Sequence, residues 1–362
     1  LGLEPVPVPD LRLPLGISFF TFHTVSYLVD VSRGVVPAVR QPSEFALYSA
    51  LFPHLVAGPI VRYREIADRL RSRIAGLAEI GDGCGRFVVG LAKKVLVADR
   101  VGEAADGIFA LGAGDLSAVL AWSGAALYAL QIYFDFSGYS DMAIGLGRML
   151  GFEFPENFDR PYASASIREF WRRWHMTLSR WFRDYLFIPL GGSRGSTLAT
   201  ARNLLIVFFL CGLWHGAAWT FVAWGLFHGF FLAAERVGEA LVDWRPPRLV
   251  ARVYTLAVVL VGWVFFRADD LARAGDFLRA MAGFGTATDG SFALASFVSP
   301  SGAIAALVGT AIVLAPASVW TIRLRDPRLE RAAAAAAIAI LLVASFAEIV
   351  AVSSRPFLYF RF

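Results

Sequence analysis

Long apolar stretches separated by short polar connections dominate the chain. A helix needs about 20 apolar residues to cross the ~30 Å hydrocarbon core of a bilayer, with tilt and breaks allowed. The pattern predicts membrane segments near residues 15–32, 45–61, 84–101, 116–134, 138–151, 203–219, 220–235, 252–267, 302–322 and 332–352. It therefore predicts an all-α fold, a polytopic integral membrane helical bundle.

Two of these segments differ from the others. The segment 84–101 carries Lys93, Lys94 and Asp99, so it is expected to lie at the membrane interface or to face a cavity. The segment 138–151 is short and rich in glycine, which predicts a half-helix or a re-entrant element. Broken backbone at membrane depth is tolerated only where protein or a cavity covers it.

The connections between the segments are basic. Residues 62–73, "RYREIADRLRSR", carry five arginines and favour a cytoplasmic loop. Residues 323–331 form a second basic turn, and 269–299 is a loop with an expected surface helix at 270–283. The chain shows no internal repeat and no soluble domain, so we expect a single transmembrane domain over 1–362.

The segment 167–185, "IREFWRRWHMTLSRWFRDY", predicts an amphipathic helix that lies in the membrane interface. Its aromatic residues fall on one side of a helix, and five arginines occupy the opposite side: Arg168, Arg172, Arg173, Arg180 and Arg183. His175 falls on the edge between the two. This helix either anchors the protein to lipid phosphates or presents His175 to a water-filled entrance.

The composition supports a membrane protein and limits its chemistry. Hydrophobic residues make up 57% of the 362 residues and charged residues 17%, against about 25% charged in a typical soluble domain. The net charge of +5 comes mainly from arginine and suits either membrane topology or an anionic substrate. Only two cysteines occur, so the sequence predicts neither a disulfide framework nor a zinc site.

His215 is the strongest candidate for chemistry. It lies in "GLWHGAAW", inside the apolar run 204–234. An ionisable group within a membrane segment faces the interior of the bundle or a cavity, and is a functional hypothesis by default. A neutral imidazole can act as a base near pH 7. The alternative is a helix-packing histidine bonded to a neighbouring carbonyl.

The other histidines in apolar surroundings favour packing. His23 and His54 lie in aromatic or Pro/Gly contexts, and His228 would point away from His215 on a continuous helix. The motifs H-x-x-x-x-D and H-E-x-x-H do not occur, so we expect neither of those catalytic constellations nor a metal.

The segment 131–162, "QIYFDFSGYSDMAIGLGRMLGFEFPENFDRPY", adds polar residues that could shape a site. Asp135 and Asp141 are six residues apart and are not expected to share a helix face. Ser137, Ser140 and Asp141 are expected to cap a helix that starts after a break at Gly138. Asn157 is interpreted as a turn residue.

Six ordered stretches make the chain resemble the membrane-bound O-acyltransferase (MBOAT) superfamily. The similarity is greatest to its polysaccharide-acetylating branch, represented by the membrane subunit of alginate O-acetyltransferase. The stretches are "PLGISFFTFHTVSYLVDVSRG", "LFPHLVAGPIVRY", the segment 131–162, "FWRRWHMTLSRWFRDYLFIPLGGSR", "GLWHGAAWTFVAWGLFHG" and "RPFLYFRF". Because relatives usually have further N-terminal helices and this chain begins at Leu1, we expect it to lack them.

The resemblance implies a helical bundle around a central funnel or tunnel. It implies that His215, in the W-H-G motif, is the catalytic base, and that His175, in the R-R-W-H motif, orients the donor or shares the proton transfer. The neighbouring Trp214 and Trp174 are expected to contact substrate. The donor is expected to be a cytoplasmic acyl-CoA, acetyl-CoA in particular, with no bound cofactor. The phosphates of CoA would suit arginines of the basic side: Arg172, Arg173, Arg180 and Arg183.

The implied acceptor is a hydroxyl of an extracytoplasmic polysaccharide, reached directly or through a periplasmic partner protein. The implied location is the inner or plasma membrane, in contact with lipid, and no nucleic-acid partner is expected. Two alternatives stay open: transfer of D-alanine from a carrier protein to a cell-wall polymer, and a non-enzymatic transporter.

Overall fold

The computed structural model describes residues 16–242, 246–285, 292–315, 326–351 and 357. Helices and loops account for all of these residues, and no strand occurs among them. Within these described ranges, three helices are long and apolar enough to cross a membrane: α9 (Thr197–His215), α11 (Arg248–Arg267) and α14 (Pro327–Ala351). The structure therefore confirms an all-α fold with helices long enough to span a membrane.

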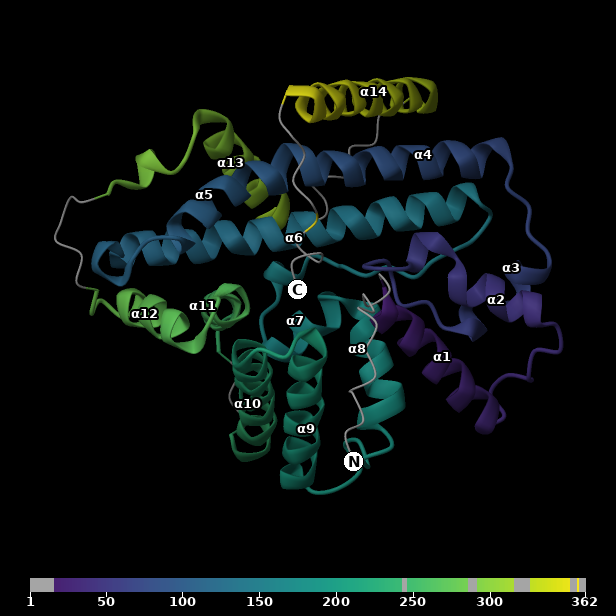
Figure 1. Ribbon diagram of the computed structural model, residues 1–362, viewed down its shortest axis with the longest axis horizontal. Helices are drawn as coiled ribbons and strands as arrows, with labels where there is room; N and C mark the ends of the chain where they lie inside the picture. Colours follow the sequence, from purple (N-terminus) through teal and green to yellow (C-terminus); the bar gives the residue numbers. More distant parts are fainter. Residues whose placement is uncertain (1–15, 243–245, 286–291, 316–325, 352–356, 358–362) are drawn as a thin grey trace, which may run out of the picture.

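Two long helices cross the whole molecule side by side (Figure 1). The first is continuous through α4 (Leu77–Ala92), the π-helical turn η2 (Lys93–Ala98) and α5 (Asp99–Phe109). The second is α6 (Ala118–Met149). α14 lies along α4 on the side away from α6, and α11 packs on α6 near its start.

Glycine lets these two helices approach closely. A Cβ atom on Gly90 would lie 2.5 Å from the carbonyl oxygen of Gly138, and one on Gly138 would lie 2.7 Å from the carbonyl oxygen of Gly90. Small residues bring helix backbones into direct contact in this way in membrane bundles. Gly138 is therefore a packing position within a helix.

This packing corrects the prediction for 116–134 and 138–151, which form the single helix α6. A separate half-helix at 138–151 is wrong, because Gly138 continues the helix against its neighbour. Ser137 and Asp141 lie inside α6 and are not N-caps.

The predicted span 45–61 is also wrong as a single helix. It divides into α2 (Pro42–Ala50), the 3₁₀ turn η1 (Phe52–His54) and an irregular stretch up to residue 62. Leu51 has an extended backbone, the conformation that separates α2 from η1. The preceding helix α1 (Ile17–Ser32) agrees with its prediction, and the basic connection forms α3 (Tyr63–Arg71).

The predicted amphipathic helix 167–185 is broken in the middle. It consists of α7 (Ile167–Arg173), α8 (Met176–Phe182) and the π-helical turn η5 (Arg183–Phe187). His175 separates them with a left-handed backbone, at φ 43°. The aromatic side packs inside the protein, where all of these residues are buried: Phe170, Trp171, Trp174, Trp181 and Phe182. The prediction of one helix that lies on the membrane interface is therefore wrong.

Helices α9 and α10 (Trp219–Leu241) form a tight hairpin whose turn follows His215 directly. The prediction placed His215 within a span at 203–219, whereas it is the last residue of α9. The remaining elements are η3 (Ala113–Asp115), η4 (Pro161–Ala163), α12 (Leu271–Met281), η6 (Leu294–Ser296) and α13 (Pro300–Leu314). The predicted helix at 270–283 is thus α12, and 316–322 of the predicted span 302–322 lies outside the described residues.

Candidate active site

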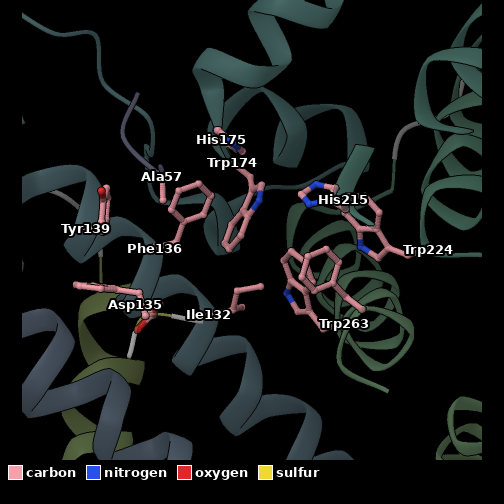
Figure 2. A pocket seen from close by; sticks show the side chains of 12 residues that line it. Ala57, Ile132, Asp135, Phe136, Tyr139, Trp174, His175, His215, Trp224 and Trp263 are labelled. Carbon is pink, nitrogen blue, oxygen red and sulfur yellow. The ribbon is translucent and has the colours of Figure 1, made fainter. Parts of the chain in front are cut away.

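Both candidate histidines line one small cavity, which we call the histidine cavity. Its volume is about 40 Å³, room for a few water molecules. Its lining is Ala57, Ile132, Asp135, Phe136, Tyr139, Trp174, His175, His215, Trp224, Trp263, Phe266 and Phe357. In Figure 2, His215, Trp224 and Trp263 lie at one end and Asp135 and Tyr139 at the other, with Trp174 and Phe136 between.

The break between α7 and α8 places His175 in this cavity. The side chain is 2% exposed, and its Nδ1 atom lies 3.0 Å from Oδ1 of Asn157. The backbone N–H of Met176 donates to the carbonyl oxygen of Asn157 at 2.9 Å. A left-handed backbone is unfavourable for a residue with a Cβ, so these bonds hold His175 in a conformation it would otherwise avoid.

His215 reaches the cavity from the C-terminal end of α9. Its ring lies edge-on to Trp224 at 5.0 Å and to Phe266 at 5.1 Å between ring centroids. Its imidazole makes no hydrogen bond to a side chain or loop within the described ranges. Its surroundings are therefore aromatic. The preceding Trp214 packs against the His215 ring and also on Phe22, at 5.1 Å between ring centroids.

Asp135 joins the cavity to a buried charge cluster. Lys94 donates to Asp135 Oδ1 at 2.6 Å and also contacts Asp99 at 2.8 Å. Lys94 and Asp135 are 6% and 5% exposed as side chains, so each charge is offset by its partner within the bundle. The π-helical turn η2 lets the adjacent Lys93 contact α6 as well, where it binds Asp141 at 2.5 Å. Asp135 and Asp141 thus bind adjacent lysines of the helix α4–η2–α5.

A second and larger hollow lies beside the first, and we call it the arginine pocket. Its volume is about 370 Å³, within the ~300–1,000 Å³ range of ligand sites. It is lined by Arg168, Trp171, Arg172, Leu178, Ser179, Phe182, Arg183, Phe187, Ser193, Thr200, Leu204, Val207, Phe208, Cys211, Leu232 and Arg236.

The two hollows are neighbours. Trp171 of the arginine pocket and Trp224 of the histidine cavity pack with ring centroids 5.6 Å apart. Cys211, also in the pocket lining, precedes His215 by one turn of α9. Two buried nitrogens in this lining, Nε1 of Trp171 and Nε of Arg236, have no hydrogen-bond partner within the described part of the chain. The pocket therefore offers donors to an acceptor-rich, anionic ligand.

The structure separates the four predicted donor arginines into two groups. Arg172 and Arg183 line the arginine pocket. Arg173 is instead paired with Glu169 at 2.8 Å, and neither Arg173 nor Arg180 belongs to the pocket lining.

Arg183 is held at the rim of the pocket by Asp184. Its Nε donates to Asp184 Oδ1 at 2.7 Å, and Arg62 binds the other carboxylate oxygen at 2.5 Å. Partial burial opposes the charged form of Asp184, but these two arginines outweigh it and hold its pKa below the ordinary value of 3.8. A carboxylate thus fixes the position of one pocket arginine.

Other predicted site residues lie outside both hollows. Ser137 is buried within α6, and Asp141 binds Arg86 at 2.8 Å as well as Lys93. Asn157 does not line the cavity but contacts His175. Within the described ranges, no group of three His, Cys, Asp or Glu side chains could hold a metal ion.

The three remaining buried histidines also lie outside the cavity. His228 packs among aromatic rings, 5.1 Å from Trp171 and 5.5 Å from Trp224 between centroids. His23 and His54 contact each other at 4.2 Å between centroids. Helix α10 is separate from α9, so the continuous helix assumed for His215 and His228 does not exist. Both rings pack on Trp224, but His228 does not line the cavity.

Sequence reasoning missed several lining residues. Tyr139 and Trp263 of the cavity, and Arg168 and Arg236 of the pocket, were not proposed as site residues. Arg236 follows an apolar run without any motif, so its sequence context gives no signal for a pocket. Tyr139 lies four residues after Asp135, and this helical spacing could have identified it.

Comparison with known proteins then decides the family. Residues 17–271 match the model of the membrane-bound O-acyltransferase family. The chain belongs to this family. Its histidine cavity and arginine pocket both lie within the residues that match, apart from Phe357.

Three curated relatives have names that state different transfer activities. The chain is 50% identical over 284 residues to a probable alginate O-acetylase AlgI of Azotobacter vinelandii, covering 78% of this chain and 56% of the relative. It is 39% identical to the peptidoglycan O-acetyltransferase of Helicobacter pylori, covering 75% and 57%. It is 30% identical to the teichoic acid D-alanyltransferase of Streptococcus thermophilus, covering 60% and 55%. The chain thus spans a little over half the length of these relatives.

Proposed function

We propose that the protein transfers an acyl group, acetyl in particular, from cytoplasmic acyl-CoA to a hydroxyl of an extracytoplasmic polysaccharide. The observation that carries this proposal is the placement of two histidines on one cavity beside an arginine-rimmed pocket. The names of the relatives at 50% and 39% identity, an alginate O-acetylase and a peptidoglycan O-acetyltransferase, support it. The protein would act in the inner or plasma membrane, directly or with a periplasmic partner.

The arginine pocket would bind the donor. CoA carries phosphates that suit Arg172 and Arg183, and amide carbonyls that suit an unpartnered indole N–H such as that of Trp171. The thioester would then enter between Trp171 and Trp224 toward the histidine cavity. At about 40 Å³ this cavity must widen to admit it. The funnel that the resemblance implies is part of this proposal.

The cavity would hold the reacting atoms. The acceptor hydroxyl gives its proton to an imidazole, for which the resemblance implies His215, and its oxygen bonds to the thioester carbon. The C–S bond then breaks, and the thiolate leaves as a thiol by taking the proton back. A positioned base of this kind contributes about 10²–10⁴-fold in rate.

The test is acyl transfer by the purified protein in nanodiscs, with radiolabelled acetyl-CoA and an oligosaccharide acceptor. His215→Ala should lower kcat by about 10²–10⁴-fold. His228→Gln is the matched control, because His228 is a buried histidine of the same hairpin outside the cavity. Wild-type turnover by His215→Ala would contradict the proposal.

Transfer of D-alanine is the rival within the family, given the relative at 30% identity. The higher identity to the two acetyl-transferring relatives favours acetyl transfer. Turnover that requires an aminoacylated carrier protein and ignores acetyl-CoA would select the rival. Family membership also favours an enzyme over a transporter.

A further inference from the structure

Asn157 lies at the centre of a buried hydrogen-bond network that ends at the histidine cavity. The residue is 1% exposed and lies in the connection between α6 and α7. Its Oδ1 atom lies 3.0 Å from Nδ1 of His175, 3.0 Å from Oγ1 of Thr177 and 3.3 Å from the backbone nitrogen of Thr177. Its Nδ2 group donates to Oγ of Ser140 at 3.1 Å.

The network determines where its protons lie. The backbone N–H of Ile60 donates to Oγ1 of Thr177 at 2.9 Å, so this hydroxyl can give its own proton to Asn157. The backbone N–H of Thr177 can only donate. Both donors require that the Asn157 atom facing them is the carbonyl oxygen, an acceptor. The Nδ1 atom of His175 faces the same oxygen and must therefore carry a proton.

A neutral histidine with a proton on Nδ1 has its lone pair on Nε2. That atom is buried and forms no hydrogen bond within the described ranges, while the His175 side chain lines the cavity. His215 differs, because it has no hydrogen bond to a described residue that would fix its tautomer. The two histidines are therefore not equivalent.

We infer that Asn157 is a positioning residue that holds His175 as the Nδ1-protonated tautomer and makes Nε2 of His175 a preorganised hydrogen-bond acceptor of the histidine cavity. This inference rests on the proposed acyl transfer. The acceptor hydroxyl donates a hydrogen bond to Nε2 of His175, which orients it, and it gives its proton to His215 as its oxygen bonds to the thioester carbon. The imidazolium of His215 returns that proton to the thiolate when the C–S bond breaks.

The charges near His175 leave this arrangement neutral. The titratable groups that share the cavity are Asp135, Tyr139 and His215. Asp135 is paired with Lys94, and the hydroxyl of Tyr139 donates to the backbone oxygen of Leu55 at 3.1 Å. The group in direct contact with the His175 ring nitrogen is the uncharged amide of Asn157. Replacing that amide by a carboxylate would therefore change the charge next to His175 selectively.

The experiment compares Asn157→Asp with wild type in nanodiscs across pH. A carboxylate beside Nδ1 stabilises the imidazolium, so the acid limb of kcat/KM should move to higher pH by about 1–3 units. Asn157→Leu should lower kcat by about 10–100-fold with little change in the donor KM. Ser140→Ala is the matched control, because it removes a partner of Asn157 while leaving Oδ1 on His175, and it should keep the wild-type pH profile.

A measurement on the unmodified protein gives an independent test. With ¹⁵N-labelled histidine, and His175→Gln to assign the signal, the Nδ1 atom of His175 should be protonated and Nε2 not. The opposite tautomer would overturn the inference. An acid limb that does not shift in Asn157→Asp would also overturn the inference. In that case, loss of activity in His215→Ala would still support the proposed acyl transfer. Wild-type turnover by His215→Ala would instead remove the proposed function.

Discussion

The histidine cavity and the arginine pocket are neighbours with opposite properties. The cavity holds about 40 Å³ and is walled mainly by aromatic rings around two histidines, whereas the pocket holds about 370 Å³ and carries four arginines. One is too small to bind a donor such as CoA, and the other lacks a histidine. Under the proposed function, the pocket would bind the donor and the cavity would hold the reacting atoms, with the Trp171–Trp224 contact between them.

Removal of a cavity histidine should give the largest effect. His215→Ala should lower kcat by about 10²–10⁴-fold, because proton transfer at the cavity is lost. The dissociation constant for CoA, measured by calorimetry in nanodiscs, should stay at the wild-type value because the pocket is untouched. A variant that loses CoA binding as strongly as turnover would show that the two hollows do not act separately.

Charge reversal in the pocket should have the complementary effect. The double variant Arg172→Glu/Arg183→Glu should raise the KM for acetyl-CoA about tenfold, since exposed ion pairs contribute about 0.2–1 kcal/mol each and reversal adds repulsion. The kcat at saturating donor should change little. Arg173→Gln is the control outside the pocket lining, and an equal rise in its KM would contradict the assignment of the pocket.

Ionic strength should distinguish the two hollows in the wild-type protein. Salt screens charges at the exposed rim of the pocket, so the donor KM should rise about threefold between 0.05 and 0.5 M NaCl. The kcat should respond little, because the cavity lining is mainly aromatic and its charged group Asp135 is paired with Lys94. Initial rates at saturating and at limiting acetyl-CoA would measure both, and a kcat that falls with salt would place a charged step in the cavity.

The smallest effect concerns the carboxylate that fixes Arg183. Asp184 has a pKa below its ordinary value of 3.8, so its stabilising contribution is complete above that pH and is lost as the pH falls through the lower folded-state pKa. Wild type should exceed Asp184→Asn in melting temperature by about 2 °C at pH 6, and by less at pH 3. A difference that is constant with pH would remove the ion pair as its cause.

Hydropathy alone predicted the fold class and several helices, but not where helices break. Gly138 was expected to end a helix and instead packs within α6, because the backbone of Gly90 lies against it. His175 was expected inside a helix and instead interrupts one, because Asn157 binds its ring and the following backbone N–H. Both outcomes depend on residues distant in sequence, which a local pattern cannot include.

The candidate site likewise combines features that the local sequence predicts with features that only the folded chain brings together. His215 could be singled out because a histidine in an apolar run is unusual, and only the family motifs joined it to His175. The sequence pattern predicted the same role for Arg172 and Arg173, although Arg172 lines the arginine pocket and Arg173 binds Glu169. Which of the two arginines faces the pocket depends on how α7 packs against its neighbours. Asn157 could be placed in a turn, but its hydrogen bonds require Ser140, Thr177 and His175 to be folded around it.

Phe357 is the last residue in chain order to line the histidine cavity, where its ring packs on Tyr139 at 5.0 Å and below the ammonium group of Lys94 at 4.8 Å. The first lining residue is Ala57, 300 positions earlier. During biosynthesis, the earlier helices can enter the membrane and pair while this wall is still missing. The cavity is therefore complete only after residue 357 has been synthesised, long after Phe266, the lining residue that precedes it in the chain.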